Sequence, residues 1–277
     1  MIYIKTSEEI RIIHEGGRRL AAILSQLSQA VQPGVRTAYL EDLANNLIEK
    51  TGGWPAFKDY PMGGDIFFPS SLCVSINNEV VHGASLPDRL LKSGDIVDLD
   101  IGMEWPIRDD LRQEFSAPNN KLSPHGGYYT DTCRTVAVGK ISSQAKKLLK
   151  VSRECLDLGI KAAQPGKRIN DIARAIENHA HNHGYGVVED LVGHGLGYYA
   201  HEKPDVFNFV IREQSADNII LEPGMVIAIE PMINAGSWEV DTGDNGYTIV
   251  TADGSLSAHF EHSIAIMPDG PLILTTQ

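Results

Sequence analysis

The sequence predicts an α+β domain built from two similar halves, because segments of the chain recur at a spacing of about 130 residues. The strand-like segment Leu91–Asp100 matches Leu221–Glu230, and both copies end on an acid. The segment Ala30–Gly34 matches Ala162–Gly166, and each is followed by apolar residues at helical spacing. Several matches in the same order favour a duplicated architecture over a chance likeness between glycine turns that precede strands.

The duplication also pairs four carboxylates. Asp100 aligns with Glu230, and the same offset places Asp131 opposite Glu261. A duplicated fold can use such pairs to enclose one metal centre between its halves, while coincidence between ordinary strand ends is the alternative.

The length of 277 residues fits a single domain spanning 1–277, with halves at about 1–140 and 141–277. Hydrophobic residues make up 42% of the chain, an ordinary share, and the apolar runs are the length of strands rather than membrane spans. The N-terminus lacks the charged-then-apolar pattern of a signal peptide. We therefore expect a cytoplasmic protein without a membrane partner.

The charge and the cysteines narrow the function classes further. A net charge of −12 argues against a general nucleic-acid binder, because affinity for phosphates requires clustered Lys and Arg. Cys73, Cys133 and Cys155 are widely spaced and form no CxxC motif, which predicts reduced thiols in a reducing compartment.

Two helices are predicted at the start of the first half. The first spans Ser7–Ser28, with Thr6 or Ser7 as its cap, acids in its first turn and a stripe of apolar residues. The second has Thr37 as a candidate cap and Gly52 where a C-terminal cap glycine belongs.

Short elements follow these helices. Residues 52–69 are rich in glycine, proline and aromatic residues and predict a loop. Leu72–Ile76 and Val80–Val81 predict strands on either side of an Asn-Asn turn.

A long excursion separates the two acids of the first half. Ile96–Ile101 predicts a short strand, whose alternation places Asp98 and Asp100 on one face. Residues 102–129 carry prolines, paired glycines and several acids, which predicts an excursion from the sheet with a short helix around Asp109–Phe115.

The second half repeats the order of helices followed by strands. Ser142–Ala163 predicts one helix, and a second begins at Ile169 or Asn170 and ends near His183, where Gly184 follows. The remainder of the chain predicts mainly strands and turns.

The densest local signal is the glycine-rich run Gly193-His-Gly-Leu-Gly-Tyr-Tyr-Ala-His201, and His82 lies in a similar Val-His-Gly segment. Glycines allow close backbone approach, which suits an active-site loop. A glycine-rich turn that carries two surface histidines, His194 and His201, explains the same pattern.

Acids at strand ends are the second signal. Glu230 ends an apolar strand, where a carboxylate is costly to bury unless it is paired or binds a metal. Strand alternation makes Glu261 point away from His262. The repeat selects Glu261 over His262 and Asp100 over Asp98.

His179 and His183 share a helix face, which raises the question of a separate metal site. No carboxylate or cysteine follows at a fitting spacing, and cationic side chains are favourable at a helix C-terminus. A structural role is the better interpretation of this histidine cluster.

Together these motifs resemble those of the methionine aminopeptidases in their short, type I form. The matching segments are Cys73–Gly83, Gly193–Gly197, His201–Pro204, Pro223–Met232 and Ser255–His262. The resemblance covers nearly the whole chain. It implies the pita-bread fold of peptidase family M24, in which two pseudo-symmetric halves surround a mostly antiparallel curved sheet with helices on its outer face.

The resemblance implies a site for two divalent metal ions, which could be Co, Mn, Fe or Zn. Asp131 and Glu261 would bridge the ions, Asp100 would serve one of them, and His194 and Glu230 would serve the other. Four carboxylates and one imidazole suit such metals, because dications held close together require compensating negative charge.

The implied activity is removal of N-terminal methionine from new proteins and peptides. Glu230 would move a proton between the attacking water and the leaving amine, and His82 and His201 would contact the substrate and stabilise the reacting centre. The implied partner is the N-terminus of a nascent chain, with transient proximity to the ribosome, and the implied state is a monomer.

The pocket for the first side chain departs from the pattern of the methionine aminopeptidases. Cys73 stands at a usual pocket position, Phe68 replaces a tyrosine, Asp65 falls where an aromatic is usual, Ala200 replaces a phenylalanine and Tyr247 replaces a tryptophan. These changes predict a wider or more polar pocket.

Three alternatives therefore stay open: an aminopeptidase with another first-residue preference, an X-Pro peptidase, and a binding protein without catalysis. The 102–129 excursion could cover the substrate entrance, bind a partner or decorate the surface.

Overall fold

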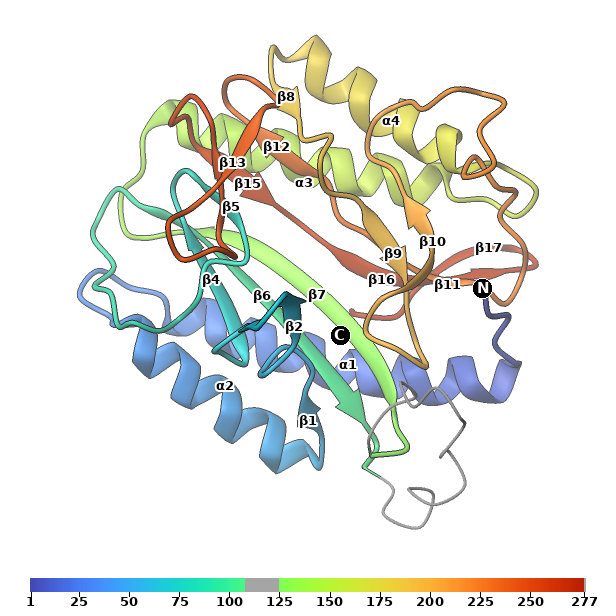
Figure 1. Cartoon of the computed structure of the whole chain (residues 1–277), viewed down its shortest axis with the longest axis horizontal. Helices are drawn as coiled ribbons and strands as arrows, with labels where there is room; N and C mark the ends of the chain where they lie inside the picture. Colours follow the sequence, from blue (N-terminus) through green and yellow to red (C-terminus); the bar gives the residue numbers. More distant parts are fainter. Residues whose placement is uncertain (108–124, 277) are drawn as a thin grey trace.

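The computed structural model describes residues 1–107 and 125–276, in which helices lie on one side of a set of antiparallel sheets (Figure 1). The helices are α1 (Ser7–Ala30), α2 (Thr37–Thr51), α3 (Ser143–Ala162) and α4 (Ile169–Asn182). None of the helices in this part of the chain is long and apolar enough to cross a membrane. The predicted α+β class is confirmed.

Strands of the first half are short except for one long hairpin. They are β1 (Trp54–Pro55), β2 (Pro61–Gly63), β3 (Ile66–Phe67), β4 (Leu72–Ile76), β5 (Glu79–Val81), β6 (Ile96–Trp105) and β7 (Tyr128–Ala137). β6 pairs with β4 on one side and with β7 on the other, and both pairings are antiparallel.

The second half contributes a five-stranded sheet in the order β10-β9-β11-β16-β17, a three-stranded sheet β15-β12-β8, and a sheet β13-β14-β5 that includes one strand of the first half. Its strands are β8 (Gly186–Val187), β9 (Gly193–Gly195), β10 (Glu202–Val206), β11 (Val226–Ile229), β12 (Met232–Asn234), β13 (Val240–Thr242), β14 (Ile249–Thr251), β15 (Ser257–His259), β16 (His262–Met267) and β17 (Gly270–Ile273).

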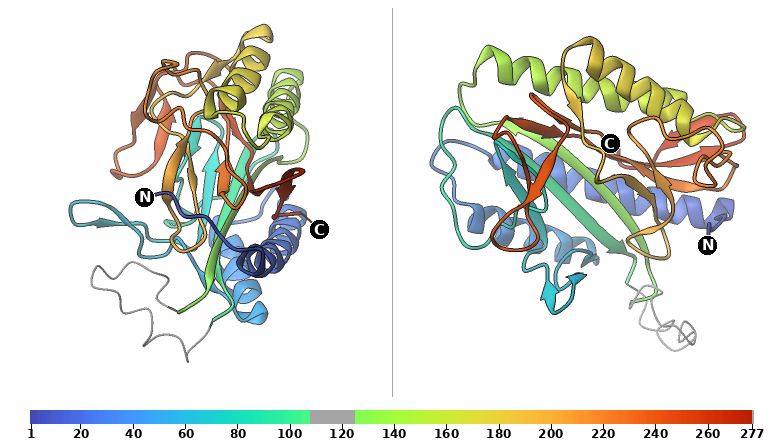
Figure 2. Two further views of the ribbon diagram at one scale, coloured as in Figure 1. Left: turned by 90° about the vertical axis from the view of Figure 1, so that its right-hand side faces the viewer. Right: turned by 45° about the horizontal axis from the view of Figure 1, so that its top comes forward.

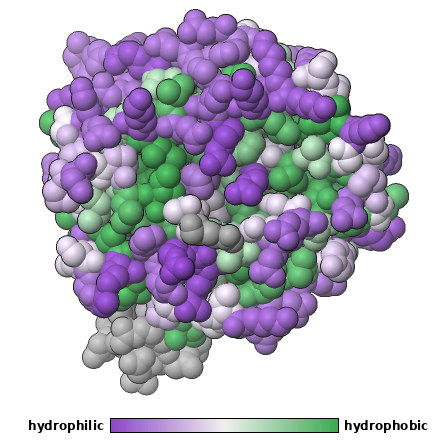
Figure 3. All heavy atoms as spheres, turned by 180° about the vertical axis from the view of Figure 1, so that it is seen from behind, coloured by the Kyte–Doolittle hydropathy of each residue, from purple (hydrophilic) through white to green (hydrophobic). Residues whose placement is uncertain are grey.

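Each half packs a pair of helices on its own strands. The apolar faces of α1 and α2, with Leu20 and Leu40, form one core with Val97 and Leu99 of β6. α3 and α4 form the corresponding core with β11, β12, β15 and β16. Figure 2 shows both helix pairs on the same side of the strands. From that side the surface is hydrophilic toward its rim, with apolar side chains gathered nearer its centre (Figure 3).

The two halves meet where β7 runs beside the end of β15 and the start of β16. Arg134 of β7 forms a bridge with Phe260, and the Ser263 hydroxyl binds both backbone groups of Asp131. Thr132 donates to the backbone oxygen of Glu261. This seam brings the acid-bearing segments of the two halves to one place.

Most helix boundaries follow the sequence prediction. α1 starts with a reciprocal capping box, in which Thr6 accepts from the Glu9 amide and the Glu9 carboxylate accepts from the Thr6 amide. Gly52 ends α2 with a φ of 72°, a conformation that favours glycine.

The prediction that Thr37 caps α2 is wrong by one residue. Arg36 is the cap, and Thr37 is the first helical residue. Its hydroxyl donates to the Ser85 backbone oxygen and accepts from the Arg89 amide, so it joins α2 to the loop after β5.

Two other boundaries differ from the prediction. The loop predicted at 52–69 contains the short strands β1, β2 and β3. The strand predicted to end at Ile101 continues to Trp105, and it pairs with β7 as far as Trp105 opposite Tyr128. Both ends of the 102–129 excursion therefore belong to the hairpin, while the helix predicted at 109–115 lies outside the described residues.

Candidate metal centre and active site

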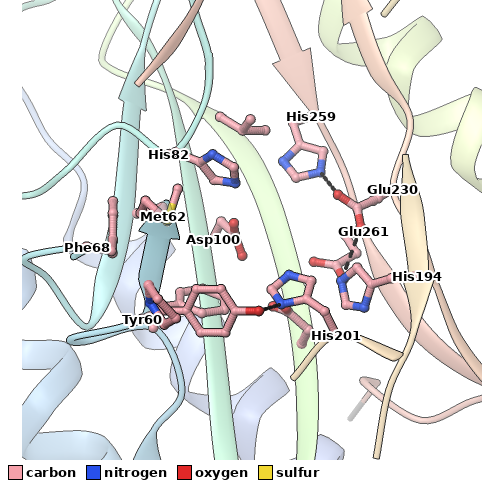
Figure 4. A pocket seen from close by; sticks show the side chains of 15 residues that line it. Tyr60, Met62, Phe68, His82, Asp100, His194, His201, Glu230, His259 and Glu261 are labelled. Carbon is pink, nitrogen blue, oxygen red and sulfur yellow. Dashed lines mark hydrogen bonds and ion pairs between the residues drawn. The ribbon is translucent and has the colours of Figure 1, made fainter. Parts of the chain in front are cut away.

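A cavity of about 290 Å³ opens where the two halves meet (Figure 4). Acids and histidines form one side of it, and aromatic and apolar side chains form the other. The lining residues are Phe57, Tyr60, Pro61, Met62, Phe68, Cys73, Val81, His82, Asp100, Asp131, His194, His201, Glu230, His259 and Glu261.

Four carboxylates enter this cavity from neighbouring strands. Asp100 comes from the middle of β6 and Asp131 from β7, while Glu230 follows β11 and Glu261 lies between β15 and β16. Asp100, Asp131 and Glu261 are each less than 10% exposed. The sequence repeat therefore led to four acids that the structure brings together.

His194 completes the cluster from β9. Its Nδ1 lies 2.9 Å from the Gly195 backbone oxygen, which accepts a hydrogen bond from it and leaves Nε2 directed at the acids. Nε2 is 3.4 Å from Glu230 Oε1. Ligand atoms of Asp131, His194 and Glu261 all lie within 4.8 Å of one another.

The electrostatics of the cluster suit bound cations. Burial, reinforced by repulsion between the acids, raises the pKa of Asp100 and of Glu261 well above the ordinary values, and burial raises the pKa of Asp131 to about 6. Among the described residues, Asp100 Oδ1, Asp131 Oδ1 and Glu261 Oε1 are buried without a hydrogen-bond donor. Buried anionic oxygens of this kind are stabilised by metal ions.

Two further histidines face the cluster from opposite sides. His201 Nδ1 lies 2.7 Å from the Tyr60 hydroxyl, and the centroid of the His201 ring lies 4.3 Å from that of the His194 ring, with the two rings tilted by 52°. Part of the His201 side chain is exposed at the mouth of the cavity. Burial of the ring by the surrounding protein, together with the neighbouring His194 and His82, nevertheless holds the pKa of His201 well below the ordinary value. Burial also lowers the pKa of His82. Both shifts favour the neutral form of the ring.

Comparison with known proteins agrees with this geometry. The model of metallopeptidase family M24 matches residues 11–107 and 122–268. The chain is 41% identical over 275 residues to the methionine aminopeptidase of Clostridium acetobutylicum, covering 99% of both chains. It is 41% identical over 276 residues to methionine aminopeptidase 1 of Bacillus subtilis, again covering 99% of both chains.

The chain belongs to metallopeptidase family M24. The crystal structure of methionine aminopeptidase from Thermotoga maritima superposes with a TM-score of 0.87 at 36% identity, covering 100% of both chains. The prolidase of Pyrococcus horikoshii shares the fold, with a TM-score of 0.72 at 20% identity over 99% of this chain and 64% of that one. The predicted pita-bread fold is confirmed, and membership of the family implies use of divalent metal.

The family match also marks the position of the excursion. It leaves out residues 108–121, between β6 and β7, while the strands on either side are matched. The acid-bearing strands therefore belong to the common M24 pattern, and the intervening segment is additional to it.

The sequence analysis did not identify His259, the last residue of β15, which lines the cavity. Its Nδ1 lies 3.3 Å from Asp98 Oδ2, and its Nε2 lies 3.5 Å from Glu230 Oε2. Burial opposes a charge on this ring, but Asp98 and Glu230 outweigh it and raise the pKa of His259 well above the ordinary value. Its position two residues before Glu261, on the same side of an extended chain, is a signal that could have found it.

Asp98 is buried beside the cluster rather than in it. Besides His259, its carboxylate accepts a hydrogen bond from the Thr135 hydroxyl at 3.3 Å. The ligand atoms of Asp98, Cys133 and His259 also lie within 4.8 Å of one another. We interpret Asp98, Cys133 and His259 as a group that holds Glu230 in position, because His259 contacts both Asp98 and the Glu230 carboxylate.

The apolar side of the cavity contains some of the predicted pocket residues. Phe68 and Cys73 line it, while Tyr247 is outside the lining and contacts Phe68, with the two ring centroids 5.6 Å apart. Asp65, in the turn between β2 and β3, and Ala200 lie outside the lining.

Besides Phe68, the 52–69 region brings two further aromatic residues to the cavity, Phe57 and Tyr60, and Pro61 and Met62 accompany them. These residues could not be predicted from the sequence, because this region has no regular alternation of apolar and polar residues.

The histidine cluster at the end of α4 does not form a site of comparable quality in the described chain. His179 Nε2 lies 3.0 Å from Glu154 Oε2, and the centroid of the His183 ring lies 4.6 Å from that of the His179 ring, with the two rings tilted by 53°. Within the described residues, His179, His183 and Glu154 do not form a group of three whose ligand atoms lie within 4.8 Å of one another, as Asp131, His194 and Glu261 do.

Proposed function

We propose that this chain is a dinuclear metalloaminopeptidase that hydrolyses the first peptide bond of a polypeptide and releases N-terminal methionine. The observation that carries the proposal is the juxtaposition, in one cavity, of a buried cluster of acids and one imidazole with an apolar recess. The similarity to methionine aminopeptidases over the full chain supports the same activity.

Five side chains would hold two divalent ions, which would be Co, Mn, Fe or Zn. Asp131 and Glu261 would bridge them, with Asp100 on one ion and His194 and Glu230 on the other. Such a pair of cations supplies an activated water and polarises the scissile carbonyl.

The protein's own groups would then carry the proton. Glu230 lies at the edge of the cluster and is held by His194 on one side and by His259 on the other, at 3.4 and 3.5 Å. This position lets its carboxylate accept the proton of the attacking water and return it to the leaving amine.

His201 would stabilise the negative charge that develops on the carbonyl oxygen. Burial raises the pKa of Tyr60, so its hydroxyl stays protonated, and we assign it as the donor of the hydrogen bond to His201 Nδ1. The proton of the neutral His201 ring is then on Nε2, and this N–H can donate a hydrogen bond to the carbonyl oxygen of the substrate. His82, on the far side of the acids, would contact the substrate near its first residue (Figure 4).

The recess for the first side chain is lined by Phe57, Met62, Phe68 and Cys73. A flexible thioether suits these surroundings, because sulfur contacts aromatic rings favourably and an unbranched chain adapts to an irregular pocket. The buried Cys73 contributes no charge, since burial raises the pKa of its thiol well above the ordinary value.

We further propose that residues 1–277 form a single domain that works as a cytoplasmic monomer on nascent-chain N-termini, in transient proximity to the ribosome. One side of the recess, formed by Pro61 and Met62 of the β2–β3 hairpin, is exposed. This exposure favours one alternative, an aminopeptidase that uses the same metal centre but accepts larger first residues.

Cleavage of a peptide panel tests the proposal. Metal-free protein is reloaded with Mn or Co and incubated with Met-Ala-Ser and with the same peptide starting with Leu, Arg or Ala, and with Xaa-Pro peptides. We expect cleavage of the Met peptide and a loss of at least a thousand-fold in Asp131→Ala. Equal cleavage of the Leu and Met peptides would establish the broader specificity, and no cleavage of any peptide would contradict the proposal.

A further inference from the structure

The most unusual interaction outside the metal centre is a fully buried ion pair between the N-terminal segment and the residue after His201. Lys5 Nζ lies 2.5 Å from Glu202 Oε2, and the two side chains are 1% and 0% exposed. Burial lowers the pKa of Lys5, and Glu202 acts in the opposite direction. Lysine is rarely buried to this extent, so the pair has a cost that a function would explain.

Glu202 uses its second oxygen to hold the loop that carries His201. Its Oε1 accepts the backbone N–H of Tyr198 at 2.6 Å and that of Tyr199 at 2.9 Å. A carboxylate that accepts two amides fixes the direction of the backbone between them. Because consecutive side chains of an extended chain point to opposite sides, Glu202 points into the protein while His201 faces the cavity.

The N-terminal segment is itself fixed to two other parts of the site. The Lys5 amide donates to the Gly224 backbone oxygen at 2.8 Å, in the turn before β11, the strand that leads to Glu230. Ile2 bridges with Lys203. The segment therefore lies between the His201 loop and the strand that carries the proposed proton carrier.

The loop packs directly on the Lys5 side chain. A Cβ added at Gly197, where φ is +131°, would lie 2.7 Å from Lys5 Cε. The Gly197 backbone oxygen accepts from the Tyr129 amide of β7 at 2.8 Å. The loop is thus enclosed by Lys5 on one side and by the Asp131-bearing strand on the other.

We infer that Lys5 is a positioning residue for catalysis, which acts through Glu202 to hold the His201 loop in register with the metal centre. The inference rests on the proposed function of His201. Neither Lys5 nor Glu202 lines the cavity, so neither contacts substrate or metal. Loss of Lys5 would leave the buried Glu202 carboxylate without its cation. Glu202 would then move away from the Tyr198 and Tyr199 amides to a position where water or another cation can solvate it.

A double-mutant cycle with His201 tests this inference. Lys5→Met, His201→Ala and the combined variant are compared with wild type on Met-Ala-Ser, with kcat and KM determined separately. We expect Lys5→Met to lower kcat at least ten-fold with KM changed less than three-fold. In the His201→Ala background the same substitution should change kcat less than two-fold, because its effect passes through His201.

Equal losses of kcat in both backgrounds would overturn the inference, since a purely structural role acts independently of His201. Glu202→Gln, which is nearly isosteric, provides the same cycle if Lys5→Met does not fold. Arg174→Met removes the cation of an exposed pair with Glu213 and is the control; it should leave kcat unchanged.

A second measurement does not depend on activity. Hydrogen exchange of the Tyr198 and Tyr199 amides should be at least ten-fold faster in Lys5→Met, while exchange in β6 and β7 and the number of Mn ions bound stay as in wild type. Unchanged exchange at these two amides would refute the inference. An inactive wild type with faster loop exchange in Lys5→Met would instead count against the proposed function alone.

Discussion

Neutralising Asp131, one of the two carboxylates proposed to bridge the metal ions, should stabilise the metal-free protein while it abolishes the metal response. Asp131 is 6% exposed, and its pKa is raised from 3.8 to about 6. In Asp131→Asn the side chain keeps its shape and can donate to a neighbouring acid, but it carries no charge to bury.

The magnitude follows from the pKa shift. Between pH 3.8 and about 6 the folded state holds a proton at Asp131 that the unfolded state has lost. The contribution to stability is therefore complete below pH 3.8 and is lost as the pH rises through about 6. At about 1.4 kcal/mol per pKa unit, ionisation of Asp131 costs the metal-free protein about 3 kcal/mol at pH 7.5. Asp131→Asn removes this cost, which corresponds to a rise in Tm of about 5–10 °C.

The assay is thermal unfolding of chelator-treated wild type and Asp131→Asn at pH 5 and pH 7.5, with and without added Mn. We expect the variant to be the more stable protein at pH 7.5 without metal, with a smaller difference at pH 5. Added Mn should raise the Tm of wild type and leave that of the variant unchanged. Asp269→Asn, at an exposed acid, is the matched control. A metal-free Asp131→Asn less stable than wild type at pH 7.5 would refute the reasoning.

Three further predictions concern the support of the site and the fold. His259→Ala should weaken Mn binding about 10–100-fold by calorimetry, because Glu230 loses one of its two neighbours; an unchanged affinity would show that His259 has no part in the centre. Tyr60→Phe should lower kcat about 3–10-fold with little change in KM, since it removes one hydrogen bond to His201, and a change in KM alone would contradict the tautomer assigned above. Gly17→Ala should destabilise the protein by about 1–3 kcal/mol in urea unfolding without changing Mn affinity, because the new Cβ would lie 2.4 Å from the Leu274 backbone oxygen.

The acid cluster could be predicted from the sequence because a duplicated fold turns a spacing along the chain into an arrangement in space. The repeat placed Asp100 opposite Glu230 and Asp131 opposite Glu261, and strand alternation then separated Glu261 from His262. These rules operate within one strand or between equivalent strands. They succeed wherever backbone geometry alone decides which side chains meet.

The parts that were missed depend on contacts across the fold. Lys5 and Glu202 are 197 residues apart in the sequence, and no periodicity connects them. Tyr60 reaches the cavity from an irregular region, where the path of the backbone decides which aromatic enters. His259 lay within a motif already identified, but its neighbours Asp98 and Glu230 come from two other strands. Only the tertiary structure reveals such partners.

The length of β6 was underestimated for a related reason. The buried Glu104 interrupts the apolar pattern after Ile101, so the sequence pattern predicts too early an end for the strand. In the structure the pairing with β7 continues to Trp105, because backbone hydrogen bonds do not require apolar side chains.

Anomalous diffraction from crystals of the Mn-loaded protein tests the central claim most directly. The account predicts two Mn peaks roughly 3.5 Å apart in the cavity, with Asp131 and Glu261 bound to both ions and with Asp100, His194 and Glu230 each bound to one. Mn at any other position, for example at His179 and His183, with the acid cluster empty, would contradict it.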